Sequence, residues 1–261
     1  MKPNLYVFDL DGTVTIESKA IPHSLQNTIR ALQRQGDYCT MATGNAFVQI
    51  VRNFKGQFIP NAPMILENGG RIVDIYESTI TEFPLEQSLI DTLPHFVTNN
   101  DITFLGFYGG IAEDYLMYSP HELTSESMVR IIGQQTRSVE QLLDWIEIYR
   151  PVRFVFGIES GQLHVPEEFN GTLAPNVGTY EITAPNVDKG SSLSVLVDHI
   201  GMQWKDVAVF GNGYNDISLF QTPADTKVYV GDECPKLEEL STHQVEDALA
   251  LDVFLRDRLN P

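Results

Sequence analysis

Two kinds of hydrophobic spacing alternate along the first third of the chain. Short apolar runs are typical of buried strands, and they are separated by segments whose apolar residues recur every three or four positions, as on one face of a helix. Leu25, Ile29 and Leu32 have this helical spacing, and Gly36 follows them as a stop signal. The pattern predicts strands at 5–8, 37–42 and 63–66 and helices at 24–35 and 46–54.

The same alternation returns near the end of the chain, after a middle part with a different pattern. A helix is predicted after Gly190, with Leu193, Leu196, Val197 and Ile200 on one face, another is predicted to start at 217–220, and strands are predicted at 206–210 and 227–230. The middle part has scattered apolar runs with helix-like stretches between them. Its clearest segments are the runs 103–108 and 153–158, the helical stretch 138–148, and 161–165, which follows closely enough to form a hairpin.

The order of these segments predicts the domain organisation. Strands that alternate with helices indicate βαβ units and a parallel sheet. We therefore expect an α/β fold with a Rossmann-like core at 1–82 and 183–261, interrupted by an inserted α+β domain at 83–182. Roughly 30 residues separate Thr13 from Thr43, and one helix and one strand account for them, so the insertion must follow Thr43.

Composition excludes several classes of protein. The 261 residues are 43% hydrophobic, which supports a packed core, and no apolar run approaches the ~20 residues of a membrane span. A net charge of −18, from 35 acidic and 17 basic residues, opposes binding to nucleic acid or anionic membranes. The N-terminus has no signal-peptide pattern, and Cys39 and Cys234 do not make a disulfide framework, so we expect a cytoplasmic protein.

Two aspartates stand directly after the first predicted strand. Asp9 and Asp11 lie at its carboxyl end, where open α/β sheets bind their ligands, and Gly12 allows a sharp turn. Such a pair suits phosphoryl transfer, because one carboxylate attacks phosphorus while the other moves a proton or helps to hold a metal. A calcium loop would need Glu at its twelfth position, which is Ala20 here, so an ordinary turn is the remaining alternative.

Three further polar clusters lie at predicted strand ends or helix starts. They are Thr43 with Gly44, Lys189, and the loop from Asn212 to Asp216. Each of them alone is compatible with a turn or a solvated lysine. A doubly wound sheet, however, gathers such positions at one edge, so their joint occurrence favours a single site.

In this order, the four clusters resemble the motifs of the haloacid dehalogenase-like phosphatase superfamily. The matching segments are Asp9-x-Asp11-Gly12-Thr13, Thr43-Gly44, Asp188-Lys189-Gly190 and Gly211-x-x-x-Asn215-Asp216. Their order and spacing are similar to the Cof-like branch, which carries a type IIB cap between its second and third motifs. The segment 65–70 also resembles the Asn-Gly element of that branch, and the likeness covers the whole chain.

The resemblance implies a role for each matching residue. Asp9 would be the nucleophile, Asp11 the general acid and base, Thr43 a hydrogen-bond partner of the transferring phosphoryl group, and Lys189 the neutralising cation. The implied cofactor is Mg²⁺, with the ligands Asp9, Asp11, Asn212 and Asp216. The implied substrate-binding residues are Gly12, Gly44, Asn45, Asn68 and Asn215.

Two positions depart from the pattern of the superfamily. Most relatives have Asp where this chain has Asn212, and an amide oxygen lacks the charge that hard cations prefer, so we expect weaker Mg²⁺ binding. Many members have Arg where this chain has Asn45, which removes a bidentate phosphate clamp. The Thr-Gly-Asn version, followed by Glu-Asn-Gly-Gly, is similar to archaeal-type phosphoglycolate phosphatases.

The implied activity is Mg²⁺-dependent hydrolysis of small phosphate monoesters, such as sugar phosphates, through an aspartyl-phosphate on Asp9. The alternatives are phosphoglycolate phosphatase-like activity, a phosphomutase or phosphotransferase, and a catalytically weakened phospho-ligand binding protein, which Asn212 supports. We expect a monomer or homodimer without nucleic-acid or membrane partners. Candidate substrate contacts in the inserted domain are Tyr108, Tyr115, Arg153 and His164.

Overall fold

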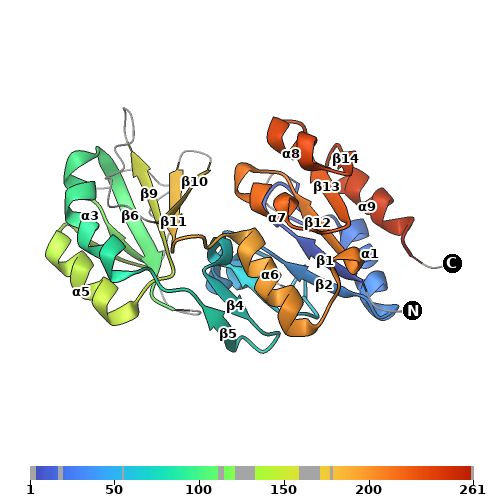
Figure 1. Cartoon of the computed structure of the whole chain (residues 1–261), viewed down its shortest axis with the longest axis horizontal. Helices are drawn as coiled ribbons and strands as arrows, with labels where there is room; N and C mark the ends of the chain where they lie inside the picture. Colours follow the sequence, from blue (N-terminus) through green and yellow to red (C-terminus); the bar gives the residue numbers. More distant parts are fainter. Residues whose placement is uncertain are drawn as a thin grey trace. The chain divides into compact units, whose positions relative to one another are not determined.

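The computed structural model describes residues 4–16, 20–54, 56–110, 115–120, 133–158, 171–176 and 179–259. The chain forms two compact units (Figure 1). We call Met1–Thr81 with Asp188–Pro261 the core unit, and Glu82–Val187 the cap unit.

A five-stranded parallel sheet lies at the centre of the core unit. Its strands are β1 (Leu5–Phe8), β2 (Tyr38–Met41), β12 (Val207–Gly211), β13 (Thr226–Val230) and β14 (His243–Val245). Their order is β14-β13-β12-β1-β2, and each neighbouring pair is parallel. The carboxyl ends of the strands therefore lie at one edge, where the segments that follow β1, β2 and β12 meet.

Helices cover both faces of this sheet, because its strands are apolar on both sides (Figure 1). Leu5 and Val7 belong to the apolar cluster with side chains of α6 (Lys189–Ile200), α7 (Ile217–Gln221) and α8 (Pro235–Leu240). On the other face, the rings of Tyr6 and Phe8 stack with Phe210, and this face is covered by α1 (His23–Arg34) and α9 (Ala248–Arg256). A hydrogen bond of 2.5 Å from Oγ1 of Thr28 to Oδ1 of Asp252 joins these two helices.

Shorter elements complete the core unit. They are α2 (Phe47–Phe54), the strands β3 (Met64–Leu66), β4 (Arg71–Val73) and β5 (Thr79–Glu82), and the 3₁₀ turns η1 (Glu67–Gly69), η2 (Trp204–Asp206) and η3 (Tyr214–Asp216). The three strands form a small sheet in the order β3-β4-β5. A parallel bridge between Ala42 and Ile65 places β3 beside the end of β2, so the turn η1 begins next to the carboxyl edge of the main sheet.

The cap unit is built on a six-stranded mixed sheet. Its elements are α3 (Gln87–Asn99), β6 (Ile102–Tyr108), β7 (Tyr115–Tyr118), β8 (Gly133–Thr136), α5 (Val139–Tyr149), β9 (Arg153–Ile158), β10 (Thr172–Asn176) and β11 (Thr179–Thr183). The strand order is β10-β11-β9-β6-β7-β8. Both helices pack on one face of the sheet, where Leu89, Phe96 and Trp145 meet Phe154 and Phe156 (Figure 1).

The predicted α/β class with a parallel core is confirmed. The helices predicted at 24–35 and 138–148 occupy His23–Arg34 and Val139–Tyr149. The hairpin segment 161–165, with His164, lies outside the described residues. No helix in the part of the chain that the structure describes is long and apolar enough to cross a membrane.

Candidate active site

A fully buried lysine lies between two carboxylates at the carboxyl edge of the core sheet. Nζ of Lys189 donates to Oδ1 of Asp9 at 2.7 Å and to Oδ1 of Asp216 at 2.6 Å. The side chains of Lys189 and Asp216 are 0% exposed, and that of Asp9 is 6% exposed. Charged side chains are almost never buried to this degree unless they are paired, so the three groups depend on one another. We call them the buried charge cluster.

The local sequence places Lys189 at an electrostatically unfavourable position. It is the first residue of α6, and Asp188 caps this helix by accepting a hydrogen bond from the N–H of Ser191 at 2.7 Å. The helix dipole disfavours a cation at this end. The carboxylates of Asp9 and Asp216 must therefore outweigh both the dipole and the desolvation of the ammonium group.

Asp216 connects the loop after β12 to the cluster. Its Oδ2 accepts hydrogen bonds from the N–H groups of Asn212 at 2.9 Å and Gly213 at 3.0 Å, while its Oδ1 accepts from Lys189. A Cβ on Gly211 would lie 2.7 Å from Cβ of Asp216, so the loop needs glycine there. Both carboxylate oxygens of this predicted metal ligand are thus engaged within the protein.

The charges of the cluster do not balance. Burial raises the pKa of Asp9, the charge of Asp216 raises it further, and Lys189 acts against both. Burial alone would lower the pKa of Lys189, but the charges of Asp216 and Asp9 outweigh burial and raise it. Two ionised carboxylates and one ammonium would leave one negative charge in a desolvated place, so either a proton on Asp9 or a further cation is favoured there.

The hydroxyl of Thr13 lies between Asp9 and Asn212. Its Oγ1 is 3.0 Å from Oδ2 of Asp9 and 3.1 Å from Oδ1 of Asn212, so the three oxygens are neighbours. The turn after β1 requires glycine at position 12 for two reasons. A Cβ there would lie 2.2 Å from Nδ2 of Asn212, and the φ of Gly12 is +85°, which other residues rarely adopt. Sequence reasoning gave Thr13 no role. Its position in the first motif was the feature of the sequence that could have identified it as a site residue.

Asp11 and Thr43 are joined through Asn45. Nδ2 of Asn45 donates to Oδ2 of Asp11 at 2.6 Å and to Oγ1 of Thr43 at 3.2 Å. Thr43 is buried and Asp11 is exposed, and Gly44 lies in the turn between Thr43 and Asn45. Desolvation by the surrounding protein raises the pKa of Asp11, although the hydrogen bond from Asn45 and the charge of Lys189 lower it.

Asn68 and Asn215 are linked to the same turn. Nδ2 of Asn215 donates to Oδ1 of Asn68 at 3.2 Å, and the N–H of Asn68 donates to the carbonyl of Thr43 at 3.0 Å. Asn68 and Glu67 have φ values of +54° and +53°, a left-handed conformation that non-glycine residues adopt rarely. The ion pair between Glu67 and Arg71, at 3.3 Å and buried, supports this turn, and sequence reasoning missed it.

The oxygens beside Thr13 fit a small, hard cation. Mg²⁺ prefers oxygen ligands, uses one or two carboxylates and usually keeps several waters. The carboxylate of Asp9 and the amide oxygen of Asn212 supply such a set, with the main-chain carbonyl of Asp11 as the resemblance implies. Within the described residues, no group of three or more His, Cys, Asp or Glu side chains is placed to hold a metal, so water would complete the shell.

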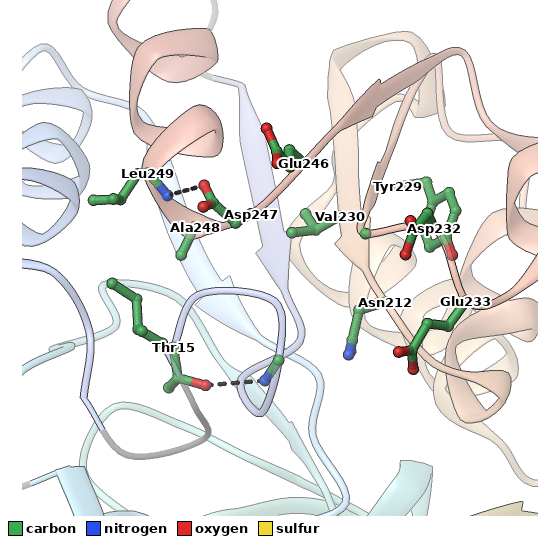
Figure 2. A pocket seen from close by; sticks show the side chains of 13 residues that line it. Thr15, Asn212, Tyr229, Val230, Asp232, Glu233, Glu246, Asp247, Ala248 and Leu249 are labelled. Atoms are coloured by element: carbon green, nitrogen blue, oxygen red, sulfur yellow. Dashed lines mark hydrogen bonds between the residues drawn. The ribbon is translucent and has the colours of Figure 1, made fainter.

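A pocket of about 410 Å³ opens beside Gly12 and Asn212, within the core unit. Figure 2 shows the carboxylates of Asp232, Glu233 and Glu246 around this pocket, with Asp247 turned to the N–H of Leu249 at the start of α9. No Lys, Arg or His is among its described lining residues. Its negative potential repels a phosphate ester, so we expect the phosphate on the side of Asn212 where Lys189 lies.

Three of the predicted substrate contacts lie on strands of the cap unit. Nη1 of Arg153 donates to Oε2 of Glu181 at 2.6 Å, and the rings of Tyr108 and Tyr115 pack edge to face with 5.0 Å between their centroids. Burial raises the pKa of Tyr115. These contacts are internal to the cap unit, and a role in substrate binding stays a prediction.

Comparison with known proteins points to one family. A model of the haloacid dehalogenase-like hydrolases matches residues 6–250. Phosphoglycolate phosphatase from Methanopyrus kandleri is 25% identical over 230 residues, which are 84% of this chain and 80% of the relative. HMP-PP phosphatase from Citrobacter koseri is 24% identical over 242 residues, or 89% and 86% of the two chains. The solved structure of the subclass IIB sugar phosphatase BT4131 covers 98% of each chain with a TM-score of 0.77 and 16% identity.

The parallel core, the inserted mixed-sheet unit and the aspartate–lysine–aspartate cluster define a phosphatase of the α/β type. The chain belongs to the haloacid dehalogenase-like hydrolase family, in its Cof-like branch, which confirms the resemblance seen in the sequence, and its fold is similar to that of a subclass IIB sugar phosphatase.

Asp216→Asn tests the buried charge cluster. An amide must turn its NH₂ group towards either the Lys189 ammonium or the two backbone N–H groups, so one donor meets another in a buried place. We expect a loss of about 3 kcal/mol in the free energy of unfolding, measured by urea denaturation. Asp198→Asn is the control, because Asp198 is exposed on α6, the helix that begins with Lys189, and its replacement should cost less than about 0.5 kcal/mol. Equal effects of the two variants would contradict this description.

Gly12→Ala tests the contact between the turn and Asn212. Gly36→Ala is a matched control, because Gly36 has a φ of +101° but nothing within 4 Å of the added Cβ. Both variants should lose about 1 kcal/mol to left-handed strain. Gly12→Ala should lose about 1 kcal/mol more, because Asn212 must leave its hydrogen bond with Thr13. Urea denaturation that gives the same loss for both would show that Asn212 is not held there.

Proposed function

We propose that the protein is a Mg²⁺-dependent phosphatase that hydrolyses small cytoplasmic phosphate monoesters, sugar phosphates or similar, through a phosphoryl group carried by Asp9. The observation that carries this proposal is the carboxylate of Asp9, which Lys189 and Thr13 hold at the carboxyl edge of the sheet. A nucleophilic carboxylate and a phosphate ester repel each other, so a buried cation beside the nucleophile is what this chemistry requires.

The proposed first step transfers the phosphoryl group to Asp9. A carboxylate oxygen of Asp9 forms a bond to phosphorus, and the bond from phosphorus to the leaving oxygen breaks. Lys189 offsets charge on Asp9, and the Thr43 hydroxyl donates to a phosphoryl oxygen. Oγ1 of Thr43 accepts from the N–H of Asn45 at 3.1 Å and from Nδ2 of Asn45 at 3.2 Å. Because these two bonds use its lone pairs, the hydroxyl hydrogen can be donated to a phosphoryl oxygen.

Asp11 is the proposed proton donor and acceptor. Its side chain is exposed, so it can reach the leaving oxygen of a substrate and later a water that attacks phosphorus. When bound by Asp9, Asn212 and the carbonyl of Asp11, Mg²⁺ would supply the positive charge that the buried charge cluster lacks. Asp216 supports this set by holding the backbone of Asn212.

The site and the relatives together support the proposed substrate class. The relatives named above are a phosphoglycolate phosphatase, an HMP-PP phosphatase and a sugar phosphatase. We propose that the cap unit selects the leaving group here, with Tyr108, Tyr115 and Arg153 as candidates. Asn45 in the Thr-Gly-Asn segment favours phosphoglycolate as a substrate to include among the sugar phosphates tested.

Asp9→Asn tests the nucleophile. Removal of the charged oxygen should lower the release of inorganic phosphate from every active ester by on the order of 10³-fold or more. The assay measures phosphate release from a panel of sugar phosphates, phosphoglycolate and 4-nitrophenyl phosphate across a Mg²⁺ titration. Asp198→Asn should retain wild-type rates. Hydrolysis by Asp9→Asn at the wild-type rate would reject the mechanism.

Asn212→Asp tests the second candidate, a phospho-ligand binding protein with a weakened metal site. The added charge beside Asp9 should lower the melting temperature without Mg²⁺ and raise Mg²⁺ affinity about tenfold, or ~1.4 kcal/mol, by titration calorimetry. A rise in phosphate release at low Mg²⁺ would then identify a tuned enzyme. Unchanged Mg²⁺ affinity would exclude Asn212 as a ligand. A wild type and variant that both lack activity at saturating Mg²⁺ would favour the binding protein.

A further inference from the structure

We propose that Asn45 is a positioning residue for Asp11: its amide holds one oxygen of that carboxyl group and thereby assigns proton transfer to the other. This inference rests on the proposed function, because it concerns the proton that the leaving group needs. It differs from the role that the resemblance implies for Asn45, which is contact with the substrate.

The geometry of the Asn45 amide carries the inference. Nδ2 has two hydrogens, and its two acceptors are Oδ2 of Asp11 at 2.6 Å and Oγ1 of Thr43 at 3.2 Å. An ionised carboxylate only accepts hydrogen bonds, so the NH₂ group rather than the amide oxygen must face Asp11. A hydrogen bond to a charged acceptor is among the stronger kinds, and this one is short.

Asn45 is itself firmly placed. Its N–H donates to Oγ1 of Thr43 at 3.1 Å, and its carbonyl accepts from the N–H of Glu67 at 3.2 Å. Thr43 is fixed in turn, because its N–H donates to the carbonyl of Ile65 at 2.9 Å. Asp11, by contrast, is exposed on the turn after β1. The contact therefore runs from a fixed residue to a partly exposed side chain, and it restricts the rotamers that Asp11 can adopt.

The consequence concerns which oxygen of Asp11 carries the proton. While Oδ2 accepts from Asn45, a proton on the carboxyl group is favoured on Oδ1. In the transfer step, the bond from Asp9 to phosphorus forms as the bond to the leaving oxygen breaks. The leaving oxygen takes the proton from Oδ1, and the electron pair of that O–H bond stays on Asp11 as carboxylate. Misplacement of the donor by about 1 Å would slow this step on the order of 10²-fold.

The leaving group distinguishes positioning from phosphate binding. An alkoxide is a strong base that must be protonated as it leaves, whereas a nitrophenolate leaves without help. Loss of Asn45 as a positioning residue should therefore damage hydrolysis of a sugar phosphate and spare that of 4-nitrophenyl phosphate. Loss of a phosphate ligand would damage both, because the two esters share the same phosphoryl group.

The experiment compares kcat/KM for a sugar 6-phosphate and for 4-nitrophenyl phosphate in the full-length protein with saturating Mg²⁺. This ratio includes steps only up to phosphoryl transfer to Asp9, so the later activation of water by Asp11 does not enter. The variants are Asn45→Ala, Asp11→Asn as the benchmark for a lost acid, and Asn53→Ala as the control. Asn53 is the same residue type, exposed on the adjoining helix α2. Melting temperatures verify that each variant folds.

We expect Asn45→Ala to lower kcat/KM for the sugar phosphate about 10- to 100-fold and that for the aryl phosphate less than about threefold. Asp11→Asn should show the same asymmetry with a larger loss, on the order of 10²- to 10⁴-fold for the sugar phosphate. Asn53→Ala should match the wild type for both esters.

Equal losses for the two esters in Asn45→Ala would overturn the inference and assign Asn45 to phosphate binding. No loss for either ester would overturn it as well. A wild type that releases phosphate from neither ester would instead reject the proposed function, and the inference with it. Asymmetry in Asp11→Asn but not in Asn45→Ala would leave the proposed function standing and reject only the role of Asn45.

Discussion

A single ammonium group, buried between two carboxylates, is the constraint on which the rest of the core unit depends. Lys189 has no exposed surface, and it begins a helix whose dipole opposes its charge. The buried ammonium group is stable only because Asp9, after β1, and Asp216, in the loop after β12, lie within hydrogen-bond distance of it. Strands β1 and β12 and helix α6 must therefore meet at one point. The same requirement places the loop after β12, because the second oxygen of Asp216 holds the backbone of that loop.

The two departures from the family pattern balance each other in charge. The resemblance implies Asp at the position of Asn212 and Arg at the position of Asn45, so the two replacements would together leave the net charge of these two positions unchanged. Each amide also has a definite partner: Oδ1 of Asn212 faces Thr13, and Nδ2 of Asn45 faces Asp11. An amide directs one donor or acceptor with less long-range field than a charge. The two amides therefore position Thr13 and Asp11 by directed hydrogen bonds and add no charge to the site.

The residues that sequence reasoning found are those whose positions follow from strand ends. Asp9, Thr43 and Asn212 come directly after, or one residue beyond, apolar runs, so a parallel sheet predicts their meeting. The role of Asp216 in holding the loop after β12 was not predictable. Its Oδ2 accepts from the backbone N–H groups of Asn212 and Gly213, and no side-chain pattern in the sequence reveals such bonds. Glu67 was not found from the sequence, and Asn68 was found only as a substrate contact, because the left-handed backbone that both residues adopt depends on tertiary packing. In the cap unit, β10 contains a proline and few apolar residues, so its pattern alone does not predict a strand.

The central claim is that Asp9 carries the phosphoryl group during turnover. The most direct measurement is an acid quench of the enzyme during steady-state turnover of a phosphate-labelled ester, followed by peptide mapping. We predict the label on the peptide that contains Asp9, its loss on treatment with hydroxylamine, and its absence from Asp9→Asn. Active turnover with no trapped label, or with the label on another residue, would contradict the claim.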